Sequence, residues 1–311
     1  MRQAAVAVAL SLLSVSCGNW SSPRGPVFVL KPILATPTNR LPDHDAVKHD
    51  ADVIAKRFAL LGYRRLRALP AEDGMSIQFP RSVDDGLVSD VVGRRGALAF
   101  CLVQEERVTY DALKTMDEKV KAGPGADTGP SAVGEAEEGT LLSHVRTIGG
   151  DFGVDDQEYP QVKQLLERVQ PYWPEGYEFL FGPSEAVEGS AVRRLYMLKA
   201  EPEMYGPVIE DAQPAPYEGS DASLANTWIV SFKLGRKDAA VFAQVTSRSI
   251  GRRIAIVLDS VVQSAPVVQT RIPEGNGMIT TNNANEEEAR HLSVLLRTGM
   301  LGLRWRVETK R

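Results

Sequence analysis

The side chains that could carry out catalysis are few in this sequence, and their spacing argues against it. His44 and His49 are five positions apart, whereas two metal-binding histidines on one face of a helix are four apart. The segment around them is explained more simply as the polar start of a helix, capped by Asp43 or Asp45. The two histidines therefore predict a helix N-terminus and no metal site.

A second candidate lies near the C-terminus, where Glu287 and His291 are four positions apart. Two ligands do not make a zinc site, which needs three or four, and acidic residues early in a helix stabilise the helix dipole. Ser247, Ser249 and Ser264 lack the Gly-x-Ser-x-Gly setting of a nucleophile elbow. The sequence also has no phosphate-binding loop and no dinucleotide-binding glycine pattern. We therefore expect no catalytic residue, no metal and no cofactor.

The sequence has two cysteines, Cys17 and Cys101. Cys101 lies within the apolar run ALAFCLV, which is typical of a buried strand. A reactive thiol needs a basic neighbour and access to solvent, so we expect a structural thiol at this position. An oxidising compartment would permit a disulfide between the two cysteines. It is not expected, because Cys17 begins a segment rich in Gly, Asn, Ser and Pro.

The N-terminal segment is typical of an export signal. Arg2 supplies a positive charge, and residues 4–16 are small or apolar and end at Cys17. As a helix this run spans only about 20 Å, less than the ~30 Å hydrocarbon core of a bilayer, so a signal peptide is favoured over a membrane anchor. Residues 13–17 (LSVSC) resemble a lipoprotein cleavage box in which the leucine is displaced by one position. We expect a signal peptide over 1–17, lipid attachment at Cys17, a tether over 18–26 and a location on the periplasmic side of the cell envelope. Plain secretion and an uncleaved short anchor are the alternatives.

Composition indicates a folded protein without an affinity for nucleic acid. The 311 residues carry a net charge of −4, with 43% hydrophobic and 24% charged residues, and these fractions are ordinary for globular chains. Nucleic-acid binding would need a clustered basic face, and the basic runs at 64–67 and 251–253 are short enough to be solvated surface charges. After the N-terminal segment no stretch approaches 18 apolar residues, so no further membrane span is predicted.

Hydrophobic periodicity and turn residues predict alternating strands and helices in two halves of the chain. The expected elements of the first half are a strand at 26–34, a helix at 45–61, strands at 64–69 and 75–79, a helix at 85–93 and a strand at 97–103. Those of the second half are a strand at 228–234, a helix at 237–247, a hairpin at 254–263, a strand at 277–281 and a helix at 285–297. Between the halves we expect a loop at 121–139 rich in Gly, Pro and acidic residues, a helix at 160–169 and strands at 177–181 and 195–200. This order predicts an α+β fold: a two-layer ferredoxin-like base built from two halves, with an inserted α/β head.

One packing contact can be predicted from residue spacing. Ala255 and Val257 share one face of a strand, and Leu292 and Leu296 share one face of a helix. We therefore expect these four side chains to form a core between the sheet and the last helix.

Residues 254–301 have the sequence IAIVLDSVVQSAPVVQTRIPEGNGMITTNNANEEEARHLSVLLRTGML, which resembles the conserved end of the first periplasmic domain of SecD. SecD is the accessory subunit of the bacterial Sec protein-export machine. Three earlier segments, 51–103, 194–219 and 230–253, resemble the same domain in the order of the family. The chain departs from the family pattern at three places. Ser260 replaces the usual turn glycine, Thr281 and Asn282 stand where the family has ITG-G, and Arg81 stands where a glycine usually follows the proline.

The resemblance implies a non-enzymatic protein whose base consists of residues 27–103 and 226–311 and whose inserted head consists of residues 104–225. In the family, this domain handles exported polypeptide, while transmembrane helices do the proton-driven work. The implied partners are unfolded or translocating polypeptide and components of the Sec translocon.

The segment PYWPEGYEFLF at 171–181 contains five aromatic residues. Exposed aromatic side chains give binding area at low entropic cost, so we expect Tyr172, Trp173, Phe179 and Phe181 to bind polypeptide. The alternative for Tyr177, Phe179 and Phe181 is that they face the core of a strand. The sequence thus predicts an envelope protein that assists Sec-dependent export by binding unfolded chains. The competing hypothesis is a structural or assembly lipoprotein that keeps the fold without an export role.

Overall fold

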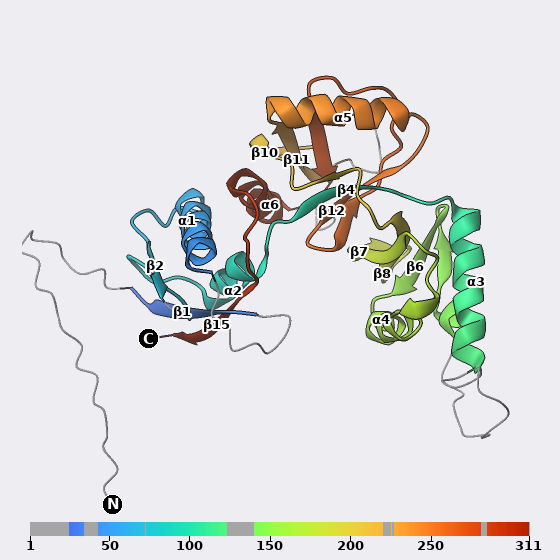
Figure 1. Cartoon of the computed structure of the whole chain (residues 1–311), viewed down its shortest axis with the longest axis horizontal. Helices are drawn as coiled ribbons and strands as arrows, with labels where there is room; N and C mark the ends of the chain where they lie inside the picture. Colours follow the sequence, from blue (N-terminus) through green and yellow to red (C-terminus); the bar gives the residue numbers. More distant parts are fainter. Residues whose placement is uncertain are drawn as a thin grey trace, which may run out of the picture.

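The computed structural model describes residues 25–33, 43–71, 73–122, 140–219, 225, 227–280 and 285–310. The predicted signal peptide, Cys17 and most of the predicted tether lie outside the described residues, as does the segment 123–139. The described chain forms three lobes, each with a hydrophobic core of its own. They follow one another across the molecule as an N-terminal, a middle and an inserted lobe (Figure 1).

The N-terminal lobe is a four-stranded antiparallel sheet with two helices packed against it. It contains β1 (Val27–Pro32), α1 (His44–Leu60), β2 (Arg67–Ala71), β3 (Gly74–Gln78), α2 (Asp85–Gly93) and β15 (Trp305–Lys310). The strand order is β15-β1-β3-β2, so a βαββα unit is completed by a fourth strand in the ferredoxin-like manner. That fourth strand comes from the end of the chain. Sequence periodicity did not predict it, and the predicted strand at 97–103 belongs to the middle lobe instead.

The middle lobe contains two sheets and two helices. Its elements are β4 (Leu98–Leu102), β9 (Met204–Tyr205), β10 (Ile209–Pro216), β11 (Trp228–Leu234), α5 (Arg236–Arg248), β12 (Ile254–Leu258), β13 (Val261–Ser264), β14 (Asn276–Thr280) and α6 (Glu286–Thr298). The strand orders are β10-β11-β14 and β13-β12-β4-β9. β4 and β12 are buried along their whole lengths, because both faces of this second sheet are covered.

The two faces of that sheet lie in different cores, which corrects one expectation. Ala255, Val257, Leu292 and Leu296 are all buried, as predicted. However, alternate side chains of a strand point to opposite faces, and only the other set of β12 side chains packs with α6 in the middle-lobe core. Ala255 and Val257 face the inserted lobe, where they pack with residues of β8. The predicted four-residue core is therefore wrong.

The inserted lobe is a second four-stranded antiparallel sheet with helices on one face. Its elements are α3 (Glu106–Ala122), the 3₁₀ helix η2 (Leu141–His144), β5 (Arg146–Ile148), β6 (Asp151–Asp155), α4 (Tyr159–Arg168), the 3₁₀ helix η3 (Gln170–Tyr172), β7 (Tyr177–Val187) and β8 (Ser190–Lys199). The strand order is β5-β6-β8-β7. The helical face forms the core of the lobe, and the opposite face packs on β4 and β12.

The insertion is shorter than the head expected at 104–225. Its sheet ends with β8 at Lys199, and β9 and β10 pair with strands of the middle lobe. The residues Lys121 and Ala122, expected in a flexible loop, form the last turn of α3. The α+β class is confirmed, with antiparallel sheets and separate helices in each lobe.

Local sequence explains the ends of the elements that matter most for the lobe junctions. At the start of α6 the Asn285 side chain accepts a hydrogen bond from the Glu288 N–H at 2.8 Å, and three glutamates in the first turn favour the helix dipole. The β12–β13 turn places Asp259 and Ser260 at φ of 51° and 65°. Two consecutive left-handed residues suit a two-residue hairpin turn, in which glycine is the least strained second residue. Ser260 occupies the position at which the resemblance expects that glycine.

Candidate functional site

The aromatic segment predicted to bind polypeptide lies at the end of α4 and on β7 of the inserted lobe. Tyr172 is 44% exposed, and Lys119 Nζ lies 4.9 Å from the centre of its ring. Trp173 is half-buried and packs edge to face on Phe179, with 5.4 Å between ring centres. Phe181 is half-buried and packs edge to face on Tyr159 at 4.9 Å.

Phe179 is a core residue, because only 4% of it is exposed and it packs in the core of the inserted lobe. The binding role assigned to it from sequence is therefore corrected. Of the four predicted rings, Tyr172 alone is exposed, so the four do not form one continuous binding platform. The Trp173 indole N–H is buried and finds no acceptor among the described residues. Burying an unpaired donor is unfavourable.

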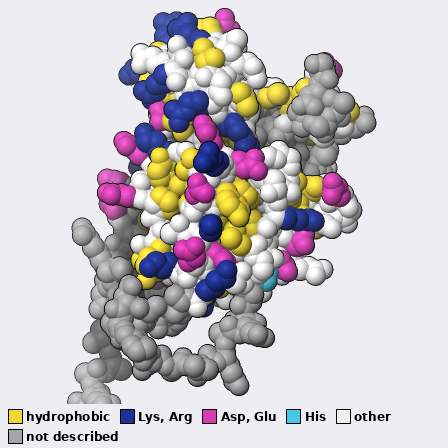
Figure 2. All heavy atoms as spheres, turned by 90° about the vertical axis from the view of Figure 1, so that its right-hand side faces the viewer, with side chains coloured by type: hydrophobic (Ala, Val, Ile, Leu, Met, Phe, Trp, Pro, Cys, Tyr) yellow, Lys and Arg dark blue, Asp and Glu magenta, His cyan; other side chains and the backbone are white. Residues whose placement is uncertain are grey.

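α3 of the same lobe, which sequence analysis missed, carries two further exposed apolar residues on opposite flanks of the helix. Val108 is 44% exposed and Tyr110 is 47% exposed. The Tyr110 ring stacks on Phe152 with 6.4 Å between ring centres. Tyr110 thus packs on Phe152 of β6, whereas Tyr172 lies beside Lys119 near the other end of α3. Figure 2, which faces this side, shows hydrophobic side chains gathered near the middle of the lobe with charges of both signs around them.

The signal for α3 was present in the sequence. Its buried residues Ala112, Leu113 and Met116 recur at three- and four-residue spacing, which is the pattern of a helix face. Asp117 is also buried, and it accepts hydrogen bonds from the Leu142 N–H at 2.9 Å and from Lys121 at 2.8 Å. Asp117 therefore holds α3 to η2, which follows α3 in the sequence after residues 123–139.

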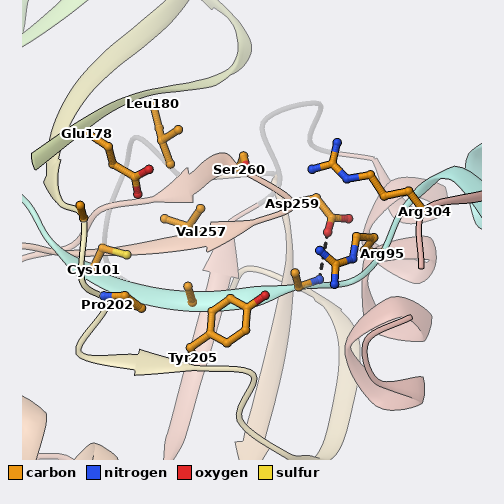
Figure 3. A pocket seen from close by; sticks show the side chains of 13 residues that line it. Arg95, Cys101, Glu178, Leu180, Pro202, Tyr205, Val257, Asp259, Ser260 and Arg304 are labelled. Carbon is orange, nitrogen blue, oxygen red and sulfur yellow. Dashed lines mark hydrogen bonds between the residues drawn. The ribbon is translucent and has the colours of Figure 1, made fainter. Parts of the chain in front are cut away.

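A cavity of about 210 Å³ lies where the three lobes meet (Figure 3). Glu178 and Leu180 of β7 enter it from the inserted lobe, and Cys101 and Val257 of the middle sheet line its floor. At its other end, Arg95 and Arg304 lie beside the β12–β13 turn. We describe it as the junction cavity below.

The titratable groups of the junction cavity do not favour catalysis. Burial raises the pKa of the Cys101 thiol to about 12, and the charges of Glu178 and Glu203 add to this effect. At neutral pH the thiol is therefore protonated and a poor nucleophile. Burial also raises the pKa of Glu178 above its ordinary value. The cavity offers an apolar floor with a carboxyl group at one end and two guanidinium groups at the other.

The junction between the N-terminal and middle lobes is held by a buried arginine. Arg57 of α1 is fully buried and donates hydrogen bonds to four backbone carbonyls and one hydroxyl. The acceptors are Val91 O at 3.0 Å, Arg94 O, Arg95 O at 2.8 Å, Gly299 O at 3.0 Å and Thr298 Oγ1 at 3.3 Å. Burial lowers the pKa of Arg57 to about 10, while nearby Asp259, Asp50 and Asp90 act in the opposite direction. The side chain stays charged at neutral pH and ties α1 and α2 to the end of α6.

Two aspartates complete this junction. Asp259 of the β12–β13 turn accepts hydrogen bonds from the N–H groups of Gly96 and Ala97, at 3.0 and 2.9 Å. Asp50 of α1 is fully buried and accepts from the Gly302 N–H, the Leu303 N–H and Trp305 Nε1 at 2.7 to 2.9 Å. Asp259 belongs to the segment 254–301 that resembles SecD, and the partners of Asp50 follow directly after that segment. The motif therefore contributes structural contacts between lobes.

A second ionic contact joins the inserted lobe to the middle lobe. Arg253 forms a two-point ion pair with Asp151 of β6, with 3.0 Å between Nη2 and Oδ2. Arg194 also contacts Asp151, at 3.2 Å, and pairs with Glu185. The basic run 251–253, interpreted from sequence as solvated charge, thus includes one arginine with a defined structural partner.

The histidines considered as metal ligands lie apart from these features. His44 and His49 are exposed on α1, and His49 Nε2 lies 3.4 Å from Met300 O. Within the described ranges, no group of three or more His, Cys, Asp or Glu side chains is arranged to hold a metal ion.

Comparison with known proteins gives the relationship. The family model described as SecDF, P1 head subdomain, matches residues 184–303. The protein translocase subunit SecD of Endomicrobium trichonymphae is 25% identical over 258 residues, which cover 83% of this chain and 45% of that protein. The SecD subunit of Treponema pallidum is 26% identical over 298 residues, which cover 92% of this chain and 43% of that protein. This chain is therefore similar to SecD over most of its length, and to the SecDF P1 head over residues 184–303.

The SecD/SecDF relationship has limits that matter for function. The chain spans less than half the length of these two relatives. A solved structure of SecDF, described as a membrane component that enhances protein export, aligns with a TM-score of 0.52 at 20% identity and covers 92% of this chain and 99% of that one. At this identity the match supports the fold. The two relatives are described as protein translocase subunits.

The match also bears on the names of the parts. The P1 head model covers the end of the inserted lobe and most of the middle lobe, and it overlaps the head expected at 104–225 only from residue 184. The assignment of base and head in this chain therefore stays a prediction. Within the described residues no helix is long and apolar enough to cross a membrane.

Proposed function

We propose that this SecD-like chain assists Sec-dependent protein export at the periplasmic side of the cell envelope by binding unfolded or translocating polypeptide. The observation that carries the proposal is the relationship to SecD along most of the chain, together with a fold like that of a SecDF protein that enhances export. Components of the Sec translocon are the proposed partners. The proposal adds no cofactor, because an extended chain can be held by apolar and backbone contacts alone.

Exposed apolar residues on and beside α3 of the inserted lobe support a role in binding. Val108, Tyr110 and Tyr172 are each between 44% and 47% exposed, and aromatic anchors provide much of the energy at binding surfaces. Lys119 lies over the Tyr172 ring, so its charge is held at the edge of the apolar area. Such a surface favours a chain with exposed hydrophobic side chains over a folded protein that has buried them. Trp173 and Phe181, half-buried at its border, are proposed to contribute less.

Lipid attachment at Cys17 is part of the proposal, and it would place this surface near the membrane through a tether. The alternative function is a structural or assembly lipoprotein of the envelope that keeps the fold and binds no exported chain. The ionic and hydrogen-bonded contacts between lobes favour a stable scaffold and are compatible with either function.

Binding of a denatured secretory precursor to the purified chain, measured by calorimetry and by photo-cross-linking from position 110, distinguishes the two. We expect weak binding that survives chelators, and at least a fivefold loss in a Tyr110→Ala, Tyr172→Ala double variant, because apolar anchors supply the energy. Tyr205→Ala is the matched control, since Tyr205 is a 56% exposed tyrosine of the middle lobe. Equal affinity for the folded and denatured precursor, or no binding to either, would favour the structural lipoprotein.

A further inference from the structure

The outer side of α5 carries an unusual combination of free cations and exposed apolar residues. Lys237, Val241 and Arg248 lie on one exposed stripe of the helix. Ile250 and Arg252 follow in the loop after α5, and Arg271 lies in the neighbouring loop, whose Ile272 N–H donates to Thr246 Oγ1 at 3.0 Å. We call this surface the α5 face. It comprises Lys237, Val241, Arg248, Ile250, Arg252 and Arg271, together with Arg236 at the start of α5 and Val267 in the neighbouring loop.

The cations of the α5 face are mostly unneutralised. Arg248 pairs with Glu203, which is only 7% exposed at its side chain. Lys237, Arg252 and Arg271 form no ion pair with any described residue. The nearest acidic side chain of α5, Asp238, accepts a hydrogen bond from the Val208 N–H at 2.9 Å. A local positive field therefore exists on a chain whose net charge is −4.

A hollow of about 600 Å³ lies alongside α5 and extends this surface. Its lining includes Arg236 and Arg271, the small face of α5, and the carboxylates of Glu210 and Glu274. Glu210 is 3.4 Å from Lys233, and Glu274 accepts from Asn276 Nδ2 at 3.2 Å. Both acids thus have partners of their own, whereas the two guanidinium groups have no carboxylate partner among the described residues. Planar guanidinium groups suit the oxygens of a phosphate.

Exposed apolar side chains stand among these charges. Ile250 is 55% exposed, Val267 is 45% exposed and Val241 is 44% exposed. The Gly251 N–H donates to Val268 O at 2.9 Å, and the Val268 N–H donates to Arg252 O at 2.9 Å, so the two loops that carry Ile250 and Val267 are held side by side. An isoleucine at the tip of an ordered loop, flanked by arginines, is typical of a surface that enters the interfacial region of a bilayer.

The α5 face also lies where a flat surface could reach it. α5 lies at the outer edge of the middle lobe (Figure 1), and its inner side packs in the middle-lobe core. Figure 2 shows Lys and Arg side chains gathered on this upper part of the molecule, with few acidic ones between them. The surface is a ridge beside a shallow hollow, which fits a planar array of headgroups better than a single extended peptide.

We propose that the α5 face binds anionic phospholipid headgroups, so that Arg236, Lys237, Arg252 and Arg271 contact phosphates while Ile250 and Val267 enter the interface. This contact is independent of lipid attachment and of polypeptide binding by the inserted lobe. It would hold the middle lobe against a membrane and leave α3, on a different lobe, open to a client chain. Each Lys or Arg near an anionic surface adds about fivefold to the affinity, which several cations together raise to a measurable level.

The test is co-sedimentation of the full chain carrying Cys17→Ser with vesicles of phosphatidylglycerol and phosphatidylethanolamine, compared with vesicles of phosphatidylcholine alone. We expect binding to the anionic vesicles only, weakened by added salt. An Arg252→Glu, Arg271→Glu double variant should bind at least about 20-fold more weakly, and Ile250→Asp should also reduce binding. Arg252→Lys should retain it, because charge rather than geometry dominates at a fluid surface.

The matched control is a Lys114→Glu, Lys163→Glu double variant, which reverses two exposed charges of the inserted lobe. It should bind vesicles like the parent chain, and both charge variants should keep the parent unfolding temperature within a degree or two. Equal losses in the two double variants would show non-specific attraction and overturn the proposal. Absence of binding to the anionic vesicles would also overturn the proposal. Stronger competition by inorganic phosphate than by chloride at equal ionic strength would overturn it as well, because it would indicate a site for free phosphate. Capture of poly-glutamate without vesicle binding would assign the surface to an acidic protein partner instead. Polypeptide binding in the Arg252→Glu, Arg271→Glu variant should be unchanged, which separates this proposal from the proposed function.

Discussion

Replacement of Arg57 is the strongest test of how the N-terminal and middle lobes are joined. The side chain has no exposed surface and donates to carbonyls of the α2 end, of the segment before β4 and of the residue that ends α6. Arg57→Ala removes all of these donors at once. It leaves four carbonyl groups of the junction without a partner, although water entering the vacated space can satisfy some of them.

The size of the effect follows from the number of bonds. A hydrogen bond from a charged group contributes about 1.5–3 kcal/mol, and an unsatisfied buried acceptor costs about 1–3 kcal/mol. In the parent chain, the guanidinium group loses its hydration on folding, which costs several kcal/mol. Arg57→Ala avoids this cost, so the net loss is several kcal/mol smaller than the sum of the lost hydrogen bonds. We expect a net loss of about 4 kcal/mol for Arg57→Ala, near the upper end for single substitutions. Arg57→Lys keeps the charge. However, an ammonium group has fewer donors than the planar guanidinium group and cannot reach all of its acceptors, so about 2 kcal/mol should be lost.

Urea unfolding followed by tryptophan fluorescence and circular dichroism measures the effect, because Trp305, Trp228 and Trp173 lie in the N-terminal, middle and inserted lobes. The matched control is Arg94→Ala, since Arg94 makes a half-exposed contact with Asp90 and such pairs contribute less than about 1 kcal/mol. A loss below about 1 kcal/mol for Arg57→Ala, or a loss equal to that of Arg94→Ala, would refute the interpretation that this side chain holds the junction.

Three further predictions concern single positions. Glu178→Gln should stabilise the chain at pH 7, because burial raises the pKa of Glu178 above 4.5. The parent is most stable when this carboxyl is protonated and loses stability as pH rises through the raised pKa. The difference in unfolding free energy between variant and parent should therefore vanish below pH 4.5, and a difference that does not change with pH would contradict the prediction. Ser260→Gly should raise stability by about 0.5–1 kcal/mol in thermal unfolding, since Ser260 has φ of 65° and glycine takes this conformation without strain; a loss would show that the hydroxyl contributes more than the backbone costs. Leu296→Ala should cost about 2–5 kcal/mol in urea unfolding, because Leu296 is 4% exposed in the middle-lobe core, and a change below about 0.5 kcal/mol would mean that α6 packs differently.

Sequence patterns predicted the regular elements with strong periodicity. The helices at 85–93, 237–247 and 285–297, the hairpin at 254–263 and the strand at 228–234 agree with α2, α5, α6, β12–β13 and β11 to within one residue or two. These segments combine a clear hydrophobic period with turn or capping residues such as Asn285 and Asp84, whose side chains accept from backbone N–H groups at 2.8 Å. Local signals and tertiary packing favour the same structure there.

The pairing of distant strands could not be predicted from local pattern. β15 alternates weakly and is largely exposed after Trp305, so little in residues 305–310 marks it as the strand that completes the first sheet. Its position depends on Asp50, which holds the preceding turn and the Trp305 indole from another part of the chain. In the same way, the alternation of β12 shows which residues share a face but not which lobe covers that face, and Ala255 and Val257 were assigned to the wrong core.

The aromatic segment of the candidate site was likewise predicted in part only. The density of aromatic residues at 171–181 indicated a feature of the inserted lobe but not the direction of each ring, because β7 turns Phe179 into the core. Tyr110 was missed because it is exposed on a helix whose buried face, and not its exposed face, produces the periodic signal. Exposed aromatic residues leave no pattern that distinguishes them from solvated ones, so only the fold shows which of them lie together.

The segments whose motifs resemble SecD include residues that hold the lobes together, and such structural contacts do not show where a polypeptide would bind. Asp259, Gly299 and the residues after α6 are joined to the N-terminal lobe by hydrogen bonds, and their types are restricted by backbone geometry and burial. α3, with Val108 and Tyr110, lies at 106–122, between the segments 51–103 and 194–219 whose motifs resemble SecD, within the 92% of the chain that aligns with SecD of Treponema pallidum. A solvent-exposed helix face is free to change while its buried face keeps the helix in place. If the chain binds polypeptide as proposed, exchange of the exposed residues of α3 should alter that binding while the junction held by Arg57 remains intact.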